Sequence, residues 1–319
     1  MTELLSRRAA LGIAGAAALG TAAASSVPAA AQTRPPVRVA GLFLDVTAQG
    51  YYAAEMEFFK AHGLDVEIVP VQNGAAAAAA LTSNNLDFGC INIVALASAH
   101  ENGLPFLWAA PGGAYSNASP TAEMVVAKSS SLRTAKDCVG KVMGIVLLKQ
   151  LADIALHSWL TKGGVDPAGV RTIELPYSAM DAALASGRID VACMEEPALS
   201  LALASNARVL AAGYSAIANQ FCEAAWVCTS DFAKANPDVV RRFTETVATT
   251  NAWANKNQAA TAKILEKYAK ATLPAGMHRC YNPPRLVASE CQPVVDAAAS
   301  FGVIKQRFDV RTVFAPGIG

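Results

Sequence analysis

The feature that most constrains the fold of this chain is a repeated alternation of short apolar strands and helices. Near-continuous apolar strands alternating with helices predict a parallel sheet that is covered on both faces. The first series has predicted strands at residues 37–44, 66–71 and 88–91 and helices at 52–61, at 74–82 and just before Gly103. These segments predict one α/β unit.

A second series repeats the same pattern after a loop rich in Pro, Gly and Ser at residues 111–120. Its predicted strands are 142–146, 170–174 and 191–194, and its predicted helices are 151–162, 178–186 and 197–205. A strand at 123–127 carries the chain out of the first unit, and a strand at 222–229 returns it. Residues 237–268 and 286–301 are predicted to be mainly helical.

No low-complexity linker separates the two units, so we expect short hinge crossings near Ala127 and Phe221. The predicted division is a leader at 1–31, lobe I at 32–127, lobe II at 128–220, and a return to lobe I with C-terminal helices at 221–319. The predicted fold class is therefore α/β, with two lobes and a cleft between them.

The N-terminus has the order of a signal peptide. The pair Arg7 and Arg8 precedes an Ala-rich apolar run at residues 11–24, and small residues lead up to Ala31. Charge, apolar core and small-residue cleavage site are typical of a leader, and paired arginines favour the twin-arginine type. The run of about 14 residues is short of the roughly 20 needed to span a membrane, which argues against the alternative of an anchor. We expect cleavage near Ala31 and a periplasmic protein.

Composition restricts the partners of the mature chain. Removing residues 1–31 takes two arginines and Glu3 from a formal charge of +1, which leaves zero. A neutral chain has no general attraction for nucleic acid or anionic lipid. The remaining length of about 288 residues exceeds the usual size of a single core and favours two lobes.

Seven cysteines leave at least one thiol unpaired whatever the pairing. Cys222 and Cys228 fall on one predicted strand, about 20 Å apart, too far for a disulfide. Cys280 with Cys291 is the more plausible pair. The preferred interpretation is that the cysteines are buried free thiols, because cysteine often serves as a small core residue. Twin-arginine export carries folded proteins, which further weakens a disulfide framework.

Four segments together resemble the substrate-binding proteins of ABC transporters of the nitrate/sulfonate/taurine type. They are EMEFFKAHGLDV at 55–66, LTSNNLDFG at 81–89, SLRTAKDCVGKV at 131–142 and LPYSAMDAALASGRIDVA at 175–192, followed by Glu196-Pro197. Each motif is weak alone, but their order and spacing agree over nearly the whole mature chain. Asn85 replaces the usual Gly, and Cys138 and Val139 surround the usual Leu position; these departures are structural.

The resemblance implies a type II periplasmic-binding-protein-like fold whose ligand lies between the lobes. It also implies a monomer that captures a small molecule without chemistry or cofactor and delivers it to a membrane permease. Loops leaving parallel strands place free N–H groups and helix N-termini in that crevice. The expected ligand is a small organic compound: an organic acid, a sulfonate or a nitrogen heterocycle.

Lobe I offers candidate ligand contacts at the ends of its predicted strands. Phe43 and Asp45 lie where the first strand ends, Asn73 follows the second strand, and Asn92 with Ile93 follows the third. Capping of the next helix is an equally good explanation for the Asp and Asn residues. The two roles are compatible, because a cap also lies at a helix N-terminus.

The remaining candidates lie in the loop at 111–120 and in lobe II. Tyr115 could stack on a ligand or be an exposed loop residue. Lys149 and Gln150 join a strand to a helix where the family places ligand contacts, beside the apolar Leu147 and Leu148. Glu195 and Glu196 precede a helix whose dipole favours acids without any ligand. A cleft-facing Glu195 would suit an amine or a ring N–H, and Trp226 is expected in the core.

Two other functional classes, an exported enzyme and the effector domain of a transcription regulator, fit the sequence less well. The chain has no Gly-x-Ser-x-Gly, Cys-x-x-Cys or His-Glu-x-x-His motif, and Asp153 with His157 fits an ordinary helix pair. A pyrimidine-synthesising enzyme family shares the implied fold, but its Cys-rich cluster is absent, so an exported enzyme is the alternative. The effector domain of a transcription regulator is excluded by the leader and by the lack of a helix-turn-helix segment.

Overall fold

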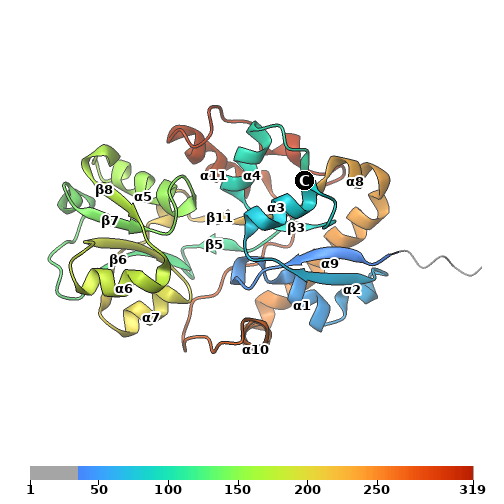
Figure 1. Cartoon of the computed structure of the whole chain (residues 1–319), viewed down its shortest axis with the longest axis horizontal. Helices are drawn as coiled ribbons and strands as arrows, with labels where there is room; N and C mark the ends of the chain where they lie inside the picture. Colours follow the sequence, from blue (N-terminus) through green and yellow to red (C-terminus); the bar gives the residue numbers. More distant parts are fainter. Residues whose placement is uncertain (1–34, 319) are drawn as a thin grey trace, which may run out of the picture. The chain divides into compact units, whose positions relative to one another are not determined.

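The computed structural model describes residues 35–318 and shows a mixed α/β protein with two sheets (Figure 1). The predicted leader and its cleavage site lie outside the described residues. No helix within residues 35–318 is long and apolar enough to cross a membrane.

The first sheet defines lobe I. Its strands are β1 Val37–Gly41, β2 Val66–Pro70, β3 Gly89–Asn92, β4 Phe106–Pro111 and β12 Ala224–Thr229. β1 pairs in parallel with β2, and a parallel bridge from Val39 to Phe88 joins β1 to the start of β3. β12 runs antiparallel between β3 and β4. The order is therefore β2-β1-β3-β12-β4.

The second sheet defines lobe II. Its strands are β6 Ala122–Ala127, β7 Val142–Ile145, β8 Arg171–Glu174, β9 Val191–Glu195 and β10 Ala207–Ala211. Their order is β10-β6-β9-β7-β8, with β7 parallel to β8 and β9. β6 is antiparallel to both of its neighbours. Reversed, this order is β8-β7-β9-β6-β10, which corresponds strand by strand to β2-β1-β3-β12-β4 of the first sheet. The inserted strands are β6 in lobe II and β12 in lobe I, and each enters its sheet from the other lobe.

The prediction of a parallel sheet is confirmed for β1 with β2 and for β7 with β8 and β9, but each sheet also contains that inserted antiparallel strand. β6 begins at Ala122 opposite Glu195, the last residue of β9, and β12 begins at Ala224 opposite Asn92, the last residue of β3. A strand that arrives from the other lobe enters at the carboxyl ends of its neighbours. It must therefore run against them.

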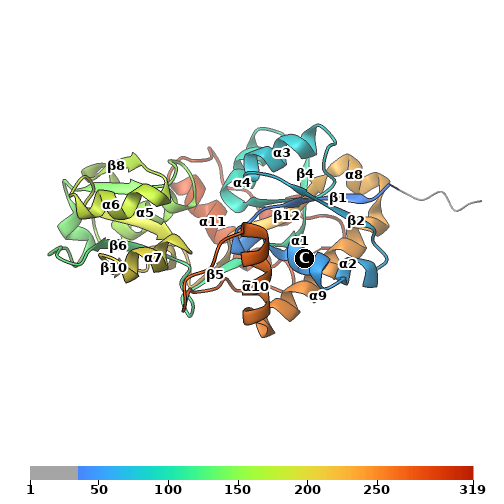
Figure 2. The ribbon, with the colours of Figure 1, turned by 60° about the horizontal axis from the view of Figure 1, so that its bottom comes forward.

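The helices cover the sheets and follow the predictions closely (Figures 1 and 2). Two of them, α3 Gly74–Thr82 and α5 Leu151–Lys162, have the predicted bounds. The helix expected at 52–61 is divided because Glu57 adopts a left-handed φ of 55°. The other helices are α1 Gln49–Glu55, α2 Phe58–Ala61, α4 Ile93–Glu101, α6 Tyr177–Ala185, α7 Ala198–Ala204, α8 Ser230–Ala235, α9 Pro237–Lys256, α10 Gln258–Ala269 and α11 Ala288–Ser300.

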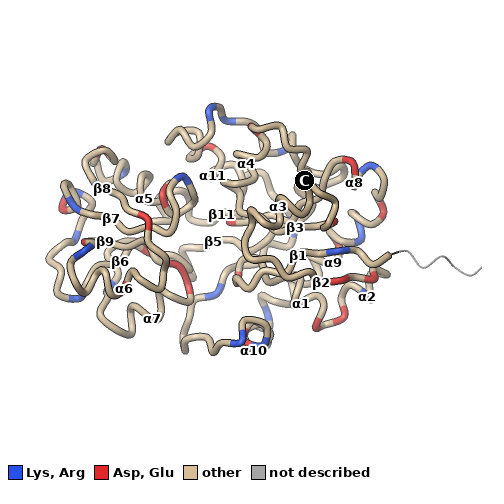
Figure 3. Tube along the Cα trace, viewed as in Figure 1, with Lys and Arg blue, Asp and Glu red and all other residues tan. Residues whose placement is uncertain are grey.

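A two-stranded ribbon lies between the two sheets. It pairs β5 Ala114–Ser116 with β11 Gln220–Cys222, and both strands carry no charge and are drawn in tan in Figure 3. The segment at 111–120, predicted as a loop, thus contains a strand. The strand predicted at 222–229 is interrupted at Glu223, which separates β11 from β12.

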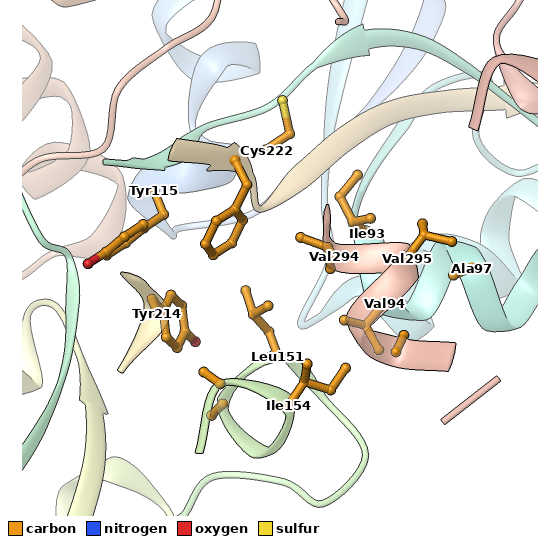
Figure 4. Packing of buried hydrophobic residues seen from close by; sticks show 14 of the residues in the cluster. Ile93, Val94, Ala97, Tyr115, Leu151, Ile154, Tyr214, Cys222, Val294 and Val295 are labelled. Carbon is orange, nitrogen blue, oxygen red and sulfur yellow. The ribbon is translucent and has the colours of Figure 1, made fainter. Parts of the chain in front are cut away.

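Helix α11 packs against β11, α4 and α5 and so contacts elements of both lobes. Val294 and Val295 of α11 belong to the same buried cluster as Ile93 of α4 and Ile154 of α5 (Figure 4). Trp226 is also fully buried, as expected, and its indole N–H donates to Gln49.

Candidate functional site

The candidate site is a cavity of about 300 Å³ at the carboxyl ends of the strands of both lobes. This is where an open α/β sheet is expected to bind a ligand, and the volume is at the lower end for small-molecule sites. Its lining residues are Leu42, Leu44, Val46, Thr47, Gly74, Cys90, Asn92, Val146, Leu147, Gln150, Leu151, Ala152, Tyr177, Glu195, Glu223 and Ala224.

A hollow of about 440 Å³ between α11 and residues 307–311 is larger but is a weaker candidate. Its arginines are already paired, Arg307 with Asp296 and Arg311 with Asp309. No end of a sheet strand contributes to it. The cavity between the lobes is therefore the better binding site.

The walls of the cavity are mainly aliphatic. Leu42 and Val46 line it from lobe I, and Leu147 and Leu151 line it from lobe II. Leu44 and Leu147 remain 53% and 49% exposed, which is unusual for leucines that face an interior space. A ligand with a carbon skeleton would remove this apolar surface from water.

Two acids occupy the polar end of the cavity, the half-buried Glu195 and the buried Glu223. Glu195 ends β9 and accepts a hydrogen bond from the Tyr214 hydroxyl. Glu223 is 6% exposed and accepts a hydrogen bond of 3.3 Å from the Thr121 hydroxyl. Burial raises the pKa of both carboxyls, and the charge of Glu195 raises the pKa of Glu223 further.

A smaller pocket of about 40 Å³ adjoins the acids and shares Leu44, Val46, Glu195 and Glu223 with the cavity. Its other lining residues are Asp45, Thr121 and Glu196. No lysine, arginine or histidine lines either space within the described part of the chain. The two spaces together form an acidic site with apolar walls.

Tyr177 adds an unsatisfied hydroxyl to the cavity. It is the first residue of α6, and its hydroxyl is shielded from solvent and has no hydrogen-bond partner. The hydroxyl lies close enough to Glu195 to interact with its carboxyl, although no hydrogen bond of regular geometry joins them, and burial raises the pKa of Tyr177 strongly. Buried polar groups in native proteins normally have partners, so this hydroxyl is available to a ligand.

Asp45 is an acid of a different kind. It begins a 3₁₀ helix at Asp45–Thr47, and its carboxylate accepts from Arg279 at 2.6 and 3.0 Å. The backbone N–H of Cys280 and the hydroxyl of Tyr52 complete its hydrogen bonds. Asp45 lines the smaller pocket, but its charge is already balanced by a buried cation.

Five predicted contacts besides Asp45 lie at or near the two spaces. Asn92, Gln150 and Glu195 line the cavity, and Glu196 lines the smaller pocket. Asn73 precedes the lining residue Gly74. Both asparagines also cap helices: Asn73 accepts from the N–H of Ala76, and Asn92 accepts from that of Ala95.

The other four predicted contacts lie outside the lining, like Asn73. Phe43 stacks on Tyr51 with ring centroids 5.2 Å apart, and Ile93 is fully buried in the core. Tyr115 is not an exposed loop residue, because it packs against Tyr214 (Figure 4). It also stacks on Phe221, and its hydroxyl bonds to that of Ser215. Lys149 has an exposed side chain, while its N–H donates to Asp153.

Sequence reasoning missed Glu223 and Tyr177. Glu223 is the only acid in the otherwise apolar run FCEAAWVC at 221–228, and this isolation was the available signal. It was interpreted as one residue of a continuous strand. Tyr177 directly precedes a predicted helix and follows a strand end in the same way as Gln150, and this position was the available signal.

All seven cysteines are buried free thiols, in agreement with the preferred interpretation. The Cys280 thiol lies beside Asp45, and the thiol of Cys291 interacts with that of Cys222. The structure therefore leaves Cys280 and Cys291, the more plausible pair, as free thiols.

A comparison with models of protein families identifies the family of this chain. A family model described as NMT1/THI5 like matches residues 45–261, more than half of the sequence. The chain belongs to the NMT1/THI5-like family. Among curated proteins no sequence match was found.

Solved structures show the same fold. The periplasmic aliphatic sulphonate binding protein SsuA from Escherichia coli has a TM-score of 0.73 and 18% identity, covering 89% of this chain and 99% of that one. The alkanesulfonate-binding protein SsuA from Xanthomonas axonopodis pv. citri, bound to MOPS, has a TM-score of 0.67 and 20% identity, covering 88% and 98%.

An enzyme is also similar in fold. A mutant of the desulfurization enzyme DSZB, in complex with biphenyl-2-sulfinic acid, has a TM-score of 0.68 and 14% identity, covering 88% of this chain and 96% of that one. These likenesses confirm the two-lobed periplasmic-binding-protein-like fold predicted from sequence. At such identities a shared fold does not decide between binding and catalysis.

Proposed function

We propose that this protein is the periplasmic solute-binding component of an ABC importer, which captures a small organic compound between its lobes and delivers it to a membrane permease. The observation that carries the proposal is the cavity itself. It takes residues from the strand ends of both lobes, so a ligand in it would contact both at once. The fold shared with the SsuA proteins supports the same role.

Capture would work by closure. The ribbon of β5 and β11 lies between the sheets, and we propose that the hinges lie in the segments that join β5 to β6 and β10 to β11. The first boundary then lies before Ala122 and not near Ala127, because β6 belongs to the sheet of lobe II. A ligand that contacts both lobes binds the closed form more tightly than the open form. That difference in affinity is sufficient to shift the population toward closure.

Binding without turnover is supported by the chemistry of the lining. Cys90 is the only thiol on the cavity wall within the described residues; it is fully buried, and burial raises its pKa. A thiol with a raised pKa holds little thiolate and is a poor nucleophile. No histidine lies on the described wall to act as its base.

A ligand screen tests the proposal. We expect a binding compound to raise the melting temperature, to reduce the radius of gyration in solution scattering, and to be recovered unchanged from the protein. Mass spectrometry that found a product formed in proportion to the protein would instead support the exported-enzyme alternative.

Export is proposed from the leader. Fractionation should find the protein in the periplasm, and Arg7→Lys with Arg8→Lys should retain the precursor in the cytoplasm, because the twin-arginine pathway reads the arginine pair. Unchanged export of the double variant would point to another route.

A further inference from the structure

We infer that Glu195 and Glu223, with the Tyr177 hydroxyl, form a recognition site for a positively charged nitrogen head group, and that this head group draws the two lobes together. This inference rests on the proposed role as a solute receptor. It selects organic amines and amidines with an apolar body and rejects sulfonates and carboxylates.

The two acids are anchored to different parts of the molecule. Glu195 is the last residue of β9 in lobe II. Glu223 immediately precedes β12 of lobe I, where its N–H donates to Gly113 at 3.0 Å and its C=O accepts from Ile93 at 2.9 Å. Both acids line the cavity and the smaller pocket. A cation between them would therefore be held from two lobes.

Glu195 and Glu223 have no cationic partner among the described residues, in contrast to Asp45. Asp45 is paired with Arg279. Glu196 accepts from the hydroxyl of Ser200 and from the N–H of His278. Glu195 and Glu223 receive neutral hydroxyls only, from Tyr214 and Thr121. A buried carboxylate needs a counter-charge, and the described residues of the site supply none to this pair.

The Tyr177 hydroxyl provides an independent sign of a ligand. It lies on the cavity wall, shielded from solvent and without a hydrogen-bond partner. A phenol can accept a hydrogen bond from an ammonium or amidinium N–H. With the two carboxyl groups it offers several oxygen acceptors to one head group, while the aliphatic walls receive the rest of the molecule.

An anionic head group does not fit this arrangement. Like charges repel strongly where burial lowers the effective dielectric constant. Lys149, the only cation that the sequence proposed for the cleft, has an exposed side chain outside the lining. A sulfonate would find acids where it needs donors.

Binding a cation should also release protons. Burial raises the pKa of both acids. A cation favours the charged carboxylates and lowers their pKa. The other groups that act on the pair are the hydroxyls of Tyr177, Tyr214 and Thr121 and the charge of Asp45, itself balanced by Arg279.

The test uses the mature protein and several aromatic and aliphatic skeletons, each offered as amine, amidine, alcohol, carboxylate and sulfonate. We expect the amine or amidine of the best skeleton to bind at least about 10-fold tighter than its alcohol, as charged hydrogen bonds allow. The matching carboxylate and sulfonate should not bind. Calorimetry in two buffers of different ionisation heat should show proton release.

Glu195→Gln and Glu223→Gln should each weaken the amine by about 10- to 100-fold, reduce the proton release and leave the alcohol unchanged. The matched control is Glu67→Gln, an exposed acid of β2, which should change nothing. Melting temperatures at or above the parent value will show that the variants fold.

The outcomes separate this inference from the proposed function. If anions bind and close the lobes, and if their affinity is the same for both Gln variants as for the parent protein, the head-group inference is overturned and the receptor role stays intact. Amines that bind equally well to the variants would overturn it too. Conversion of a bound amine to product would retain the recognition site and overturn the receptor role.

Discussion

Two acidic corners of the same cleft make opposite use of a carboxylate. At one, Asp45 lies against Arg279, with side-chain exposures of 13% and 10%, and every oxygen is occupied by a donor of the protein itself. At the other, Glu195 and Glu223 each accept a hydrogen bond from one neutral hydroxyl and have no cationic partner among the described residues. The comparison teaches that proximity to a cleft does not define a ligand contact; an unmet need for charge does.

The largest expected effect concerns the paired corner. Asp45→Ala should lower the free energy of unfolding by about 3–5 kcal/mol, because it leaves the buried Arg279 without a counter-charge. Urea denaturation measures the loss. The control is Asp309→Ala, whose pair with Arg311 is exposed and should cost less than about 1 kcal/mol. Equal losses for the two variants would remove the distinction between the corners.

Tyr177→Phe tests the corner that holds Glu195 and Glu223. The variant removes a hydroxyl that has no protein partner, so we expect stability to stay the same or rise by up to about 1 kcal/mol. Affinity for the amine ligand should fall by about 5- to 10-fold, measured by calorimetry. Tyr214→Phe is the matched control and should lose stability, because its hydroxyl donates to Glu195. A stability loss for Tyr177→Phe would show that its hydroxyl is satisfied.

A smaller effect is expected in the pH dependence of stability. Burial, with the charge of Glu196, raises the pKa of Glu123 from 4.5 to about 7. Between these values the folded state binds more protons than the unfolded state, so this group makes the free energy of unfolding fall as pH rises. Glu123→Gln should reduce that fall by about 1 kcal/mol after allowance for solvent screening, measured by urea unfolding at about pH 4.5 and 7.5. An unchanged slope would show that Glu123 is freely solvated.

The smallest effect is expected at Lys149. Lys149→Ala should change ligand affinity by less than about 2-fold, because the side chain is exposed and lies outside the lining. Titration of the best ligand at low and physiological salt provides the measurement. A loss of about 10-fold or more would mean that the ligand is an anion, and the preferred chemistry of the cleft would be reversed.

The sequence predicted the elements of both lobes well. The helices at 74–82 and 151–162 have the expected bounds, because each begins after a strand and ends at a clear break in the apolar pattern. It also placed Asn92, Gln150 and Glu195 at strand ends that do meet at one cavity. Local patterns fix such positions, since the carboxyl ends of neighbouring parallel strands lie together.

The errors have a common cause, which is pairing between distant segments. Strand β5 lies in a loop-like stretch and forms only because β11 pairs with it from a distant part of the chain. β6 and β12 are antiparallel because they enter from the opposite lobe. No pattern within a single segment carries this information.

For this protein, the sequence by itself determined the alternation of strands and helices, the two-lobed architecture and the family, because these follow from periodicity and from the order of motifs. Only the tertiary structure decided which acids are free. Asp45 meets Arg279 across 234 residues of chain, whereas Glu223, hidden in an apolar run, meets no cation within the described residues. A carboxylate's role depends on its neighbours in space, and charge balance is settled only when the chain has folded.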